Sequence, residues 1–104
     1  MAGLGKFLKQ AQKMQEQMTR VQEELAQREV EGTAGGGAVT AVAKCDGTVA
    51  RIKIDPKVVD PADVEMLEDL ILSAVANALE IAKKTQTEEM NKVTAGLSLP
   101  GMGM

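Results

Sequence analysis

Basic side chains are concentrated at the start of this chain. Residues 1–20 carry four cations against the single carboxylate of Glu16, a local balance of +3 (4 − 1). The four cations are Lys6, Lys9, Lys13 and Arg20. Ammonium and guanidinium groups at this density can neutralise phosphate oxygens, whereas ordinary solvated surface charge explains such a cluster about as well. The cluster alone therefore leaves anion binding and a merely solvated face as alternatives.

The rest of the charge argues against a simple basic nucleic-acid binder. The chain has 12 Lys and Arg residues against 15 Asp and Glu residues, a net charge of −3. Residues 58–82 contain six carboxylates and no cation, whereas residues 83–104 contain three cations and two carboxylates. The charge thus separates along the chain into basic ends and an acidic remainder. Because salt screens charges beyond about 8–10 Å, a bound polyanion responds mainly to the nearby basic segment.

Few residues are suited to catalysis or cofactor binding. The chain has no His, which removes an imidazole base and a His ligand for zinc. Cys45 is the single cysteine, and without His to activate it we interpret it as a packed side chain. A carboxylate cluster could form a metal or acid/base site, but helix-start acids and a solvated face explain it better. It comprises Asp60, Asp63, Glu65, Glu68 and Asp69. We therefore predict a protein that is not an enzyme and has no cofactor and no metal.

The first basic segment lies on a predicted helix. Apolar residues from position 4 to position 25 alternate between three- and four-residue steps, the pattern of a heptad seam. They are Leu4, Phe7, Ala11, Met14, Met18, Val21 and Leu25. The spacing predicts a helix from about Leu4 to Gln27, and a seam this narrow needs another helix to cover it.

The middle of the chain predicts three antiparallel strands, at residues 29–33, 38–45 and 48–54. Asp46-Gly47 between two β-rich runs is typical of a two-residue hairpin turn. That turn would pair Cys45 with Thr48, Ala43 with Ala50, Ala41 with Ile52, and Val39 with Ile54. The glycines at 35–37 precede a strand rather than a helix, so we interpret them as a turn and not as a phosphate-binding loop.

The last part of the chain predicts a long helix. Asp55-Pro56 ends the third strand, and Asp60-Pro61 favours Asp60 as the N-cap with Pro61 at the first helical position. Val59 and Val64 stand at hydrophobic-staple positions. The helix is apolar on more than one side and is expected to end at Gly96. Residues 97–104 are expected to form a flexible tail.

The predicted core is thin. Of the apolar 44% of the 104 residues, 14 residues are Ala and 7 are Met, and Phe7 is the single aromatic residue. The length fits one domain, but a core without large aromatic side chains buries little area. We therefore expect part of the apolar surface to be buried against a second copy. No apolar stretch approaches the roughly 18 residues of a membrane span.

Five segments together carry a resemblance to a known family. They are Leu8–Gln15, Ile54-Asp55-Pro56, Glu65–Leu70, Thr85-Gln86 and Leu99-Pro100-Gly101. Their order resembles the YbaB/EbfC family of bacterial nucleoid-associated proteins over nearly the whole chain. The resemblance implies an α+β fold, in which α-β-β-β-α subunits with a three-stranded antiparallel sheet form a tweezer-like homodimer. It also implies one DNA-binding domain over residues 1–104 and a location in the cytoplasm, at the nucleoid.

The resemblance also implies where DNA is bound. Family contacts lie on helical arms, which correspond here to the outer part of the first helix and the end of the last. Carried over by position, the DNA-binding residues are Lys6, Lys9, Lys13, Lys83, Lys84 and Lys92. Near Met90 many family members carry a basic residue where this chain has Glu88-Glu89, which weakens the expected contribution of the last helix.

Two functions of different classes remain. The first is a homodimer that binds duplex DNA with little sequence specificity, alters DNA conformation, organises the nucleoid and influences gene expression. The absence of Tyr and Trp argues against single-strand or RNA recognition by stacking. The second is a coiled-coil module whose helical arms grip a protein partner. Neither function involves a membrane or a small-molecule substrate.

Overall fold

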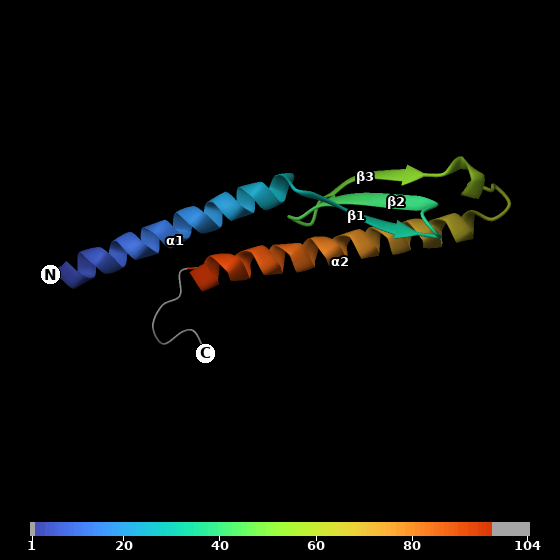
Figure 1. Cartoon of the computed structure of the whole chain (residues 1–104). Helices are drawn as coiled ribbons and strands as arrows, with labels where there is room; N and C mark the ends of the chain where they lie inside the picture. The colour runs from blue at the N-terminus through green and yellow to red at the C-terminus, as the bar shows by residue number, and fades with distance from the viewer. Residues whose placement is uncertain (1, 97–104) are drawn as a thin grey trace.

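A computed structural model describes residues 2–96 (Figure 1). Residue 1 and residues 97–104 lie outside the description, and with them the expected tail. The elements in chain order are α1 (Ala2–Gln27), β1 (Glu29–Ala34), β2 (Val39–Lys44), β3 (Val49–Ile54), a short 3-10 helix η1 (Pro56–Val58) and α2 (Val64–Gly96). This order confirms the predicted α-β-β-β-α fold class. None of the helices within residues 2–96 combines the length and apolarity needed to cross a membrane.

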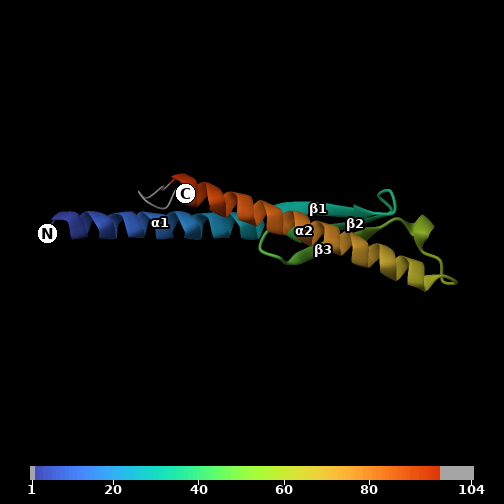
Figure 2. The same ribbon diagram turned by 90° about the horizontal axis from the view of Figure 1, so that it is seen from below.

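The three strands form one antiparallel sheet in the order β1-β2-β3. The helix α2 lies along one face of this sheet and packs mainly on β1 and β2 (Figures 1 and 2). The turn between β1 and β2 uses Gly35, Gly36 and Gly37, all with positive φ, which glycine adopts without strain. The predicted inter-strand turn at these glycines is therefore confirmed.

The hairpin between β2 and β3 differs from the prediction near its turn. The N–H of Lys44 donates to the carbonyl of Thr48 (2.7 Å), and the N–H of Gly47 donates to the carbonyl of Lys44 (2.9 Å). The loop therefore has three residues, Cys45 to Gly47, with Gly47 at φ 95°, a common three-residue hairpin geometry. The prediction of a Cys45–Thr48 pair was wrong, because an Asp-Gly sequence suits both loop lengths.

A bulge in β3 restores the predicted register. Ala43 pairs with Val49 rather than with Ala50, and the irregularity lies between Val42 and Ala43. Two residues of β3 there oppose one of β2, which leaves Ala50 unpaired. Beyond the bulge, Ala41 pairs with Ile52 and Val39 with Ile54, as predicted.

Small side chains bring α2 very close to the sheet. Ala74 and Ala78 of α2 pack with Val39, Ala41 and Ala43 of β2 in a fully buried cluster. A Cβ atom placed on Gly32 of β1 would lie 2.2 Å from the Ala78 backbone nitrogen. The alanine content that made the core seem thin therefore allows close contact between helix and sheet.

The helix α2 begins three residues later than predicted. The carboxylate of Asp63 accepts a hydrogen bond from the Met66 N–H (3.2 Å), so Asp63 is the N-cap. Asp60 instead accepts from the Ala62 N–H (2.9 Å) within a preceding turn that contains Pro61. Asp60 as the N-cap, Pro61 as the first helical residue, and the Val59–Val64 staple were therefore wrong. Several Asp residues in this segment cap different turns, and propensity alone does not rank them.

Candidate nucleic-acid interface

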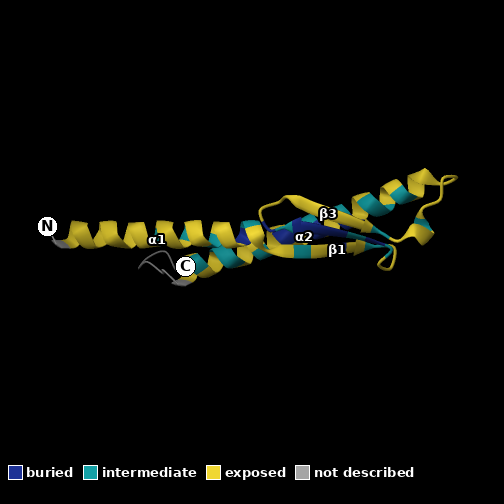
Figure 3. Ribbon diagram, turned by 90° about the horizontal axis from the view of Figure 1, so that it is seen from above, coloured by how far each residue is buried: buried dark blue, intermediate teal, exposed yellow. Residues whose placement is uncertain are grey.

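The outer part of α1 projects from the molecule as an arm. Both side views show α1 running past the end of α2 (Figures 1 and 2), and the molecule measures 74 × 25 × 16 Å. Leu25, which is 3% exposed, anchors the inner end of α1. Met14, Met18 and Val21 are half-buried, whereas Phe7 is 62% exposed. The apolar seam is thus covered near the sheet and open toward the tip (Figure 3). We call residues 2–20 the α1 arm.

The basic residues of the α1 arm form one stripe. At about 100° per residue, Lys6, Lys9 and Lys13 fall within about 60° of the helix circumference. All three are exposed. Lys6 lies about 100° round the helix from the seam residue Phe7, and Lys13 lies about 100° from the seam residue Met14. Because the seam turns toward α2, the lysine stripe faces away from it.

Arg20 extends the same stripe and was not among the predicted contacts. It follows Lys13 by seven residues, as Lys13 follows Lys6, and a seven-residue step turns a helix by only about 20° from two full turns. Arg20 is exposed. The heptad spacing of these three cations was the available signal in the sequence.

The predicted cations of α2 do not form a stripe. Lys83, Lys84 and Lys92 are exposed but spread over about 180° of the helix circumference. Lys92 is also engaged by a carboxylate: its Nζ lies 3.3 Å from Oε1 of Glu89. The structure therefore groups the three predicted residues of α1 and separates the three of α2.

An ion pair joins the two helices where they diverge. The guanidinium of Arg28, just after α1, donates from Nη1 to Oε1 of Glu89 at 3.1 Å. The two residues line a cavity of about 240 Å³ together with Val21, Glu24 and Leu25. Hydrogen bonds from Lys92, and then from Arg28, lower the pKa of Glu89 below its usual value. Sequence reasoning missed this contact, because its members are 61 residues apart.

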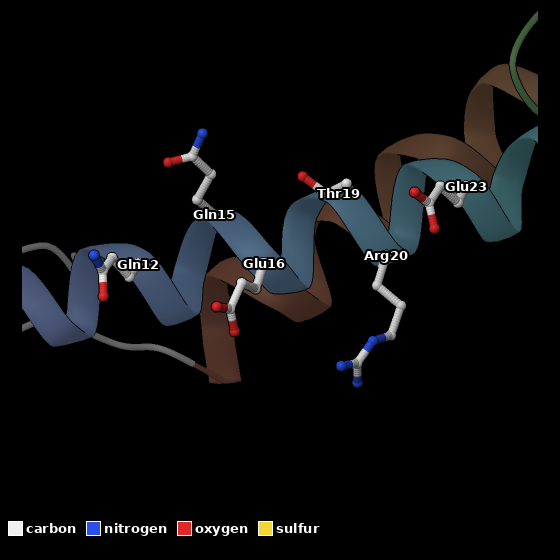
Figure 4. Close-up of a pocket in the computed structure, with 6 residues that line it drawn as sticks. All are labelled: Gln12, Gln15, Glu16, Thr19, Arg20 and Glu23. Carbon is white, nitrogen blue, oxygen red and sulfur yellow. The ribbon is translucent and has the colours of Figure 1, made fainter.

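A polar depression runs along the side of the α1 arm. Its lining comes from α1 alone (Figure 4). The residues are Gln12, Gln15, Glu16, Thr19, Arg20 and Glu23. Because one helix supplies all of its walls, the depression is open and encloses no small molecule. It offers a hydrogen-bonding surface beside the lysine stripe.

Cys45 and Asp63, two of the other candidate reactive groups, have structural roles. Cys45 is 1% exposed, and desolvation by burial raises the pKa of its thiol, which disfavours the nucleophilic thiolate. Asp63 caps α2. Within residues 2–96, no three potential metal ligands of the His, Cys, Asp or Glu type lie close enough to hold a metal ion.

One cation of the sheet is paired across the outer face. The two terminal nitrogens of Arg51 on β3 bind both carboxylate oxygens of Glu29 on β1, at 2.7 and 3.0 Å. Since β2 lies between these strands, the pair bridges the sheet. Val42, the partner of Arg51 on that face, is only 6% exposed. This arrangement uses Arg51 to stabilise the sheet.

The arrangement is that of an α+β protein with a projecting cationic helix, and comparison with known proteins places it in a family. A family model described as the YbaB/EbfC DNA-binding family matches residues 1–97. This protein belongs to that family.

Curated relatives agree with this assignment, and one solved structure agrees with the fold. A "Nucleoid-associated protein" of Acetivibrio thermocellus is 54% identical over 100 residues, covering 95% of this chain and 88% of the relative. One of the same description from Pelotomaculum thermopropionicum is 50% identical over 99 residues, covering 95% of this chain and 94% of the relative. The crystal structure of an uncharacterized Helicobacter pylori protein matches with a TM-score of 0.62 at 17% identity. It covers 75% of this chain and 90% of the other chain, and it supports the fold alone.

Proposed function

We propose that this protein binds duplex DNA as a homodimer with little sequence specificity, mainly through the α1 arm. The observation that carries the proposal is the stripe of Lys6, Lys9 and Lys13, which is exposed and faces away from α2 on a helix that projects beyond the end of α2 (Figure 1). Bound in this way, the protein would alter DNA conformation, organise the nucleoid and influence gene expression. The names of its relatives support a location at the nucleoid.

Phosphate contact is the mode of binding that these residues favour. Lysine is a flexible point charge that binds phosphate without fixed geometry. Phosphate contacts position a protein on DNA and carry no direct sequence information. The polar surface beside the stripe consists of glutamine, threonine and charged side chains on one helix. Sequence preference would then follow from DNA shape and deformability.

Apolar surface on β3 supports the homodimer. Val49 and Ile52 pair with inward-facing residues of β2, yet they are 38% and 42% exposed because α2 covers mainly β1 and β2 (Figure 3). Leu72 of α2 is 69% exposed and lies about 140° round the helix from Asn77, which binds the Thr33 carbonyl of β1. We propose that a second copy covers β3 and the side of α2 that carries Leu72. The α1 arm of each subunit then stays free.

A salt-titrated gel shift with a duplex tests the DNA proposal. Charge reversal of Lys6, Lys9 and Lys13 to Glu should abolish low-salt binding. The matched control reverses Lys44, Lys53 and Lys57, which carry the same charge but lie outside the arm. The DNA affinity of this control should be closer to that of the wild type than the affinity of the arm variant is. Equal binding by the wild type and the arm variant would contradict the proposal, as would absence of low-salt binding by the wild type.

Light scattering tests the dimer separately. The wild type should have twice the mass of the 11.0 kDa chain, and Ile52→Asp should shift it toward the monomer. Val59→Asp is the control, because Val59 is 51% exposed but lies in the segment between η1 and α2. A folded wild-type monomer near 11 kDa would overturn the dimer.

The open end of the seam favours a second candidate function. Leu4 and Phe7 are 61% and 62% exposed, and a heptad seam is the pattern by which helices pair. A coiled-coil module would grip a protein partner with this surface. In that case the double variant Leu4→Ser, Phe7→Ser would no longer bind the protein partner. The variant with Lys6, Lys9 and Lys13 reversed to Glu would still bind it.

A further inference from the structure

Glu89 of α2 lies beside the inner end of α1, where it lines a cavity with Leu25 and Arg28. A single oxygen, Oε1, accepts from Arg28 Nη1 at 3.1 Å and from Lys92 Nζ at 3.3 Å. The Glu89 side chain is 26% exposed, whereas those of Arg28 and Lys92 are 55% and 72% exposed. The carboxylate is therefore the sheltered member of the group, and its two cationic partners are the members that a large ligand can reach.

A phosphate group and the Glu89 carboxylate are chemically similar acceptors for these cations. Both are anions that accept charge-assisted hydrogen bonds from ammonium and guanidinium groups. Lys92 and Arg28 cannot give their full charge to DNA while Glu89 holds them. Glu24 lines the same cavity and adds negative charge on the α1 side.

We propose that Glu89 is a built-in competitor for DNA phosphate, which withholds Lys92 and Arg28 from the duplex and confines binding to the α1 arm. This inference rests on the proposed DNA-binding function. On this proposal, Arg28 and Lys92 form a phosphate-binding site once the Glu89 carboxylate is neutralised. Because Glu89 holds Lys92, the end of α2 contacts DNA only weakly.

Glu88 provides a matched control. It is the adjacent residue on α2 and is exposed, and among the interactions of residues 2–96 its side chain forms no hydrogen bond or ion pair. Glu88→Gln and Glu89→Gln change the net charge equally and keep nearly the same side-chain volume. A difference between them therefore reports the contacts of Glu89 rather than the overall charge.

The experiment measures duplex affinity against salt for the full chain and its variants. Each phosphate contact adds about 0.9 to the slope of log affinity against log salt concentration. Glu89→Gln should steepen the slope by up to about 4, since Arg28 and Lys92 of both subunits become available to phosphate, and should bind at least about threefold more tightly than Glu88→Gln at low salt. Glu88→Gln should keep the wild-type slope.

Substitution of the lysine gives a second, independent readout. In the wild-type background Lys92→Gln should leave the slope unchanged, whereas Lys9→Gln should reduce it by about 2 for the dimer. In the Glu89→Gln background, Lys92→Gln should remove about half of the added slope, because Arg28 is still available to phosphate. Circular dichroism and light scattering on every variant check that fold and mass are retained.

The outcomes separate this inference from the function on which it rests. If the wild type binds DNA and the two glutamate variants have the same slope, Glu89 is not a competitor. The same conclusion follows if Lys92→Gln weakens the wild type as much as Lys9→Gln does. If no variant binds duplex at low salt, the proposed function itself is wrong.

Discussion

The sheet with its covering helix and the α1 arm use the same kinds of residue in opposite ways. The body comprises β1 to β3 and residues 67–82 of α2. Small residues that are buried there set the distance between helix and sheet: Gly32, Ala41, Ala43, Ala74 and Ala78. In the arm, glycine and large apolar residues are exposed together near the tip. Packing restricts the body, whereas the arm is a nearly isolated helix.

The difference explains how a short chain can present a long charged surface. A helix of 26 residues spans about 39 Å, and among its described side chains those that are buried or half-buried begin at Met14. Its stability depends on local helix propensity over most of that length. Changes in the arm should therefore affect binding more than folding, and changes in the body should affect folding first.

Alanine substitution of glycine should give the largest contrast between the two regions. Gly32→Ala puts a Cβ at 2.2 Å from Ala78 N and 2.6 Å from Ala74 O, both backbone atoms that a side-chain rotation cannot relieve. We expect a loss of about 3 kcal/mol or more in the free energy of unfolding, or failure to fold, because overpacking here shifts the helix. Urea unfolding followed by circular dichroism measures it.

The matched change in the arm is Gly5→Ala. A Cβ on Gly5 meets nothing within 4 Å, and alanine is a better helix former than glycine by about 1 kcal/mol. Gly5→Ala should therefore keep or slightly raise stability and increase helix content. Equal losses for Gly5→Ala and Gly32→Ala would break the division into body and arm.

The sequence predicts the elements of this fold better than it predicts their ends. The Asp46-Gly47 turn was located, but the three-residue loop depends on Lys44 pairing with Thr48, a contact that the dipeptide does not encode. Likewise, Asp55 caps η1 and Asp63 caps α2. Which Asp begins the long helix depends on the path of the chain around the end of the sheet.

The candidate site follows the same rule. The family resemblance supplied the three lysines of α1, and heptad spacing would have added Arg20. The Lys92–Glu89 contact is an i,i+3 pair that a helical sequence suggests. The pairing of Glu89 with Arg28 crosses 61 residues and requires knowing where α1 meets α2.

Truncation of leucine should give a smaller contrast of the same kind. Leu25 is 3% exposed and Leu4 is 61% exposed on the same seam. Leu25→Ala should cost about 2–4 kcal/mol in the free energy of unfolding, through lost burial and a residual cavity. Leu4→Ala should stay within about 0.5 kcal/mol of the wild type.

Chemical denaturation of both leucine variants checks this at a fixed protein concentration, because a dimer's stability depends on concentration. A large cost for Leu4→Ala would instead mean that the tip of the seam is buried in solution. Light scattering on the same samples would then show whether a second copy covers it.

The smallest contrast concerns charge and pH. The hydrogen bond from Arg51 lowers the pKa of Glu29 below its usual value of 4.5, so this pair stabilises the body above the unfolded-state pKa. Its contribution is lost as the pH falls through the lowered folded-state pKa. The stability gap between wild type and Glu29→Gln should therefore be present at pH 7 and should close as the pH falls below 4.5 and through the lowered pKa of Glu29. Glu16→Gln, in the arm, should leave stability unchanged from the wild type at pH 7. Thermal unfolding across this range measures both, and a Glu29→Gln gap that persists in acid would show that the side chain acts through packing rather than through its charge.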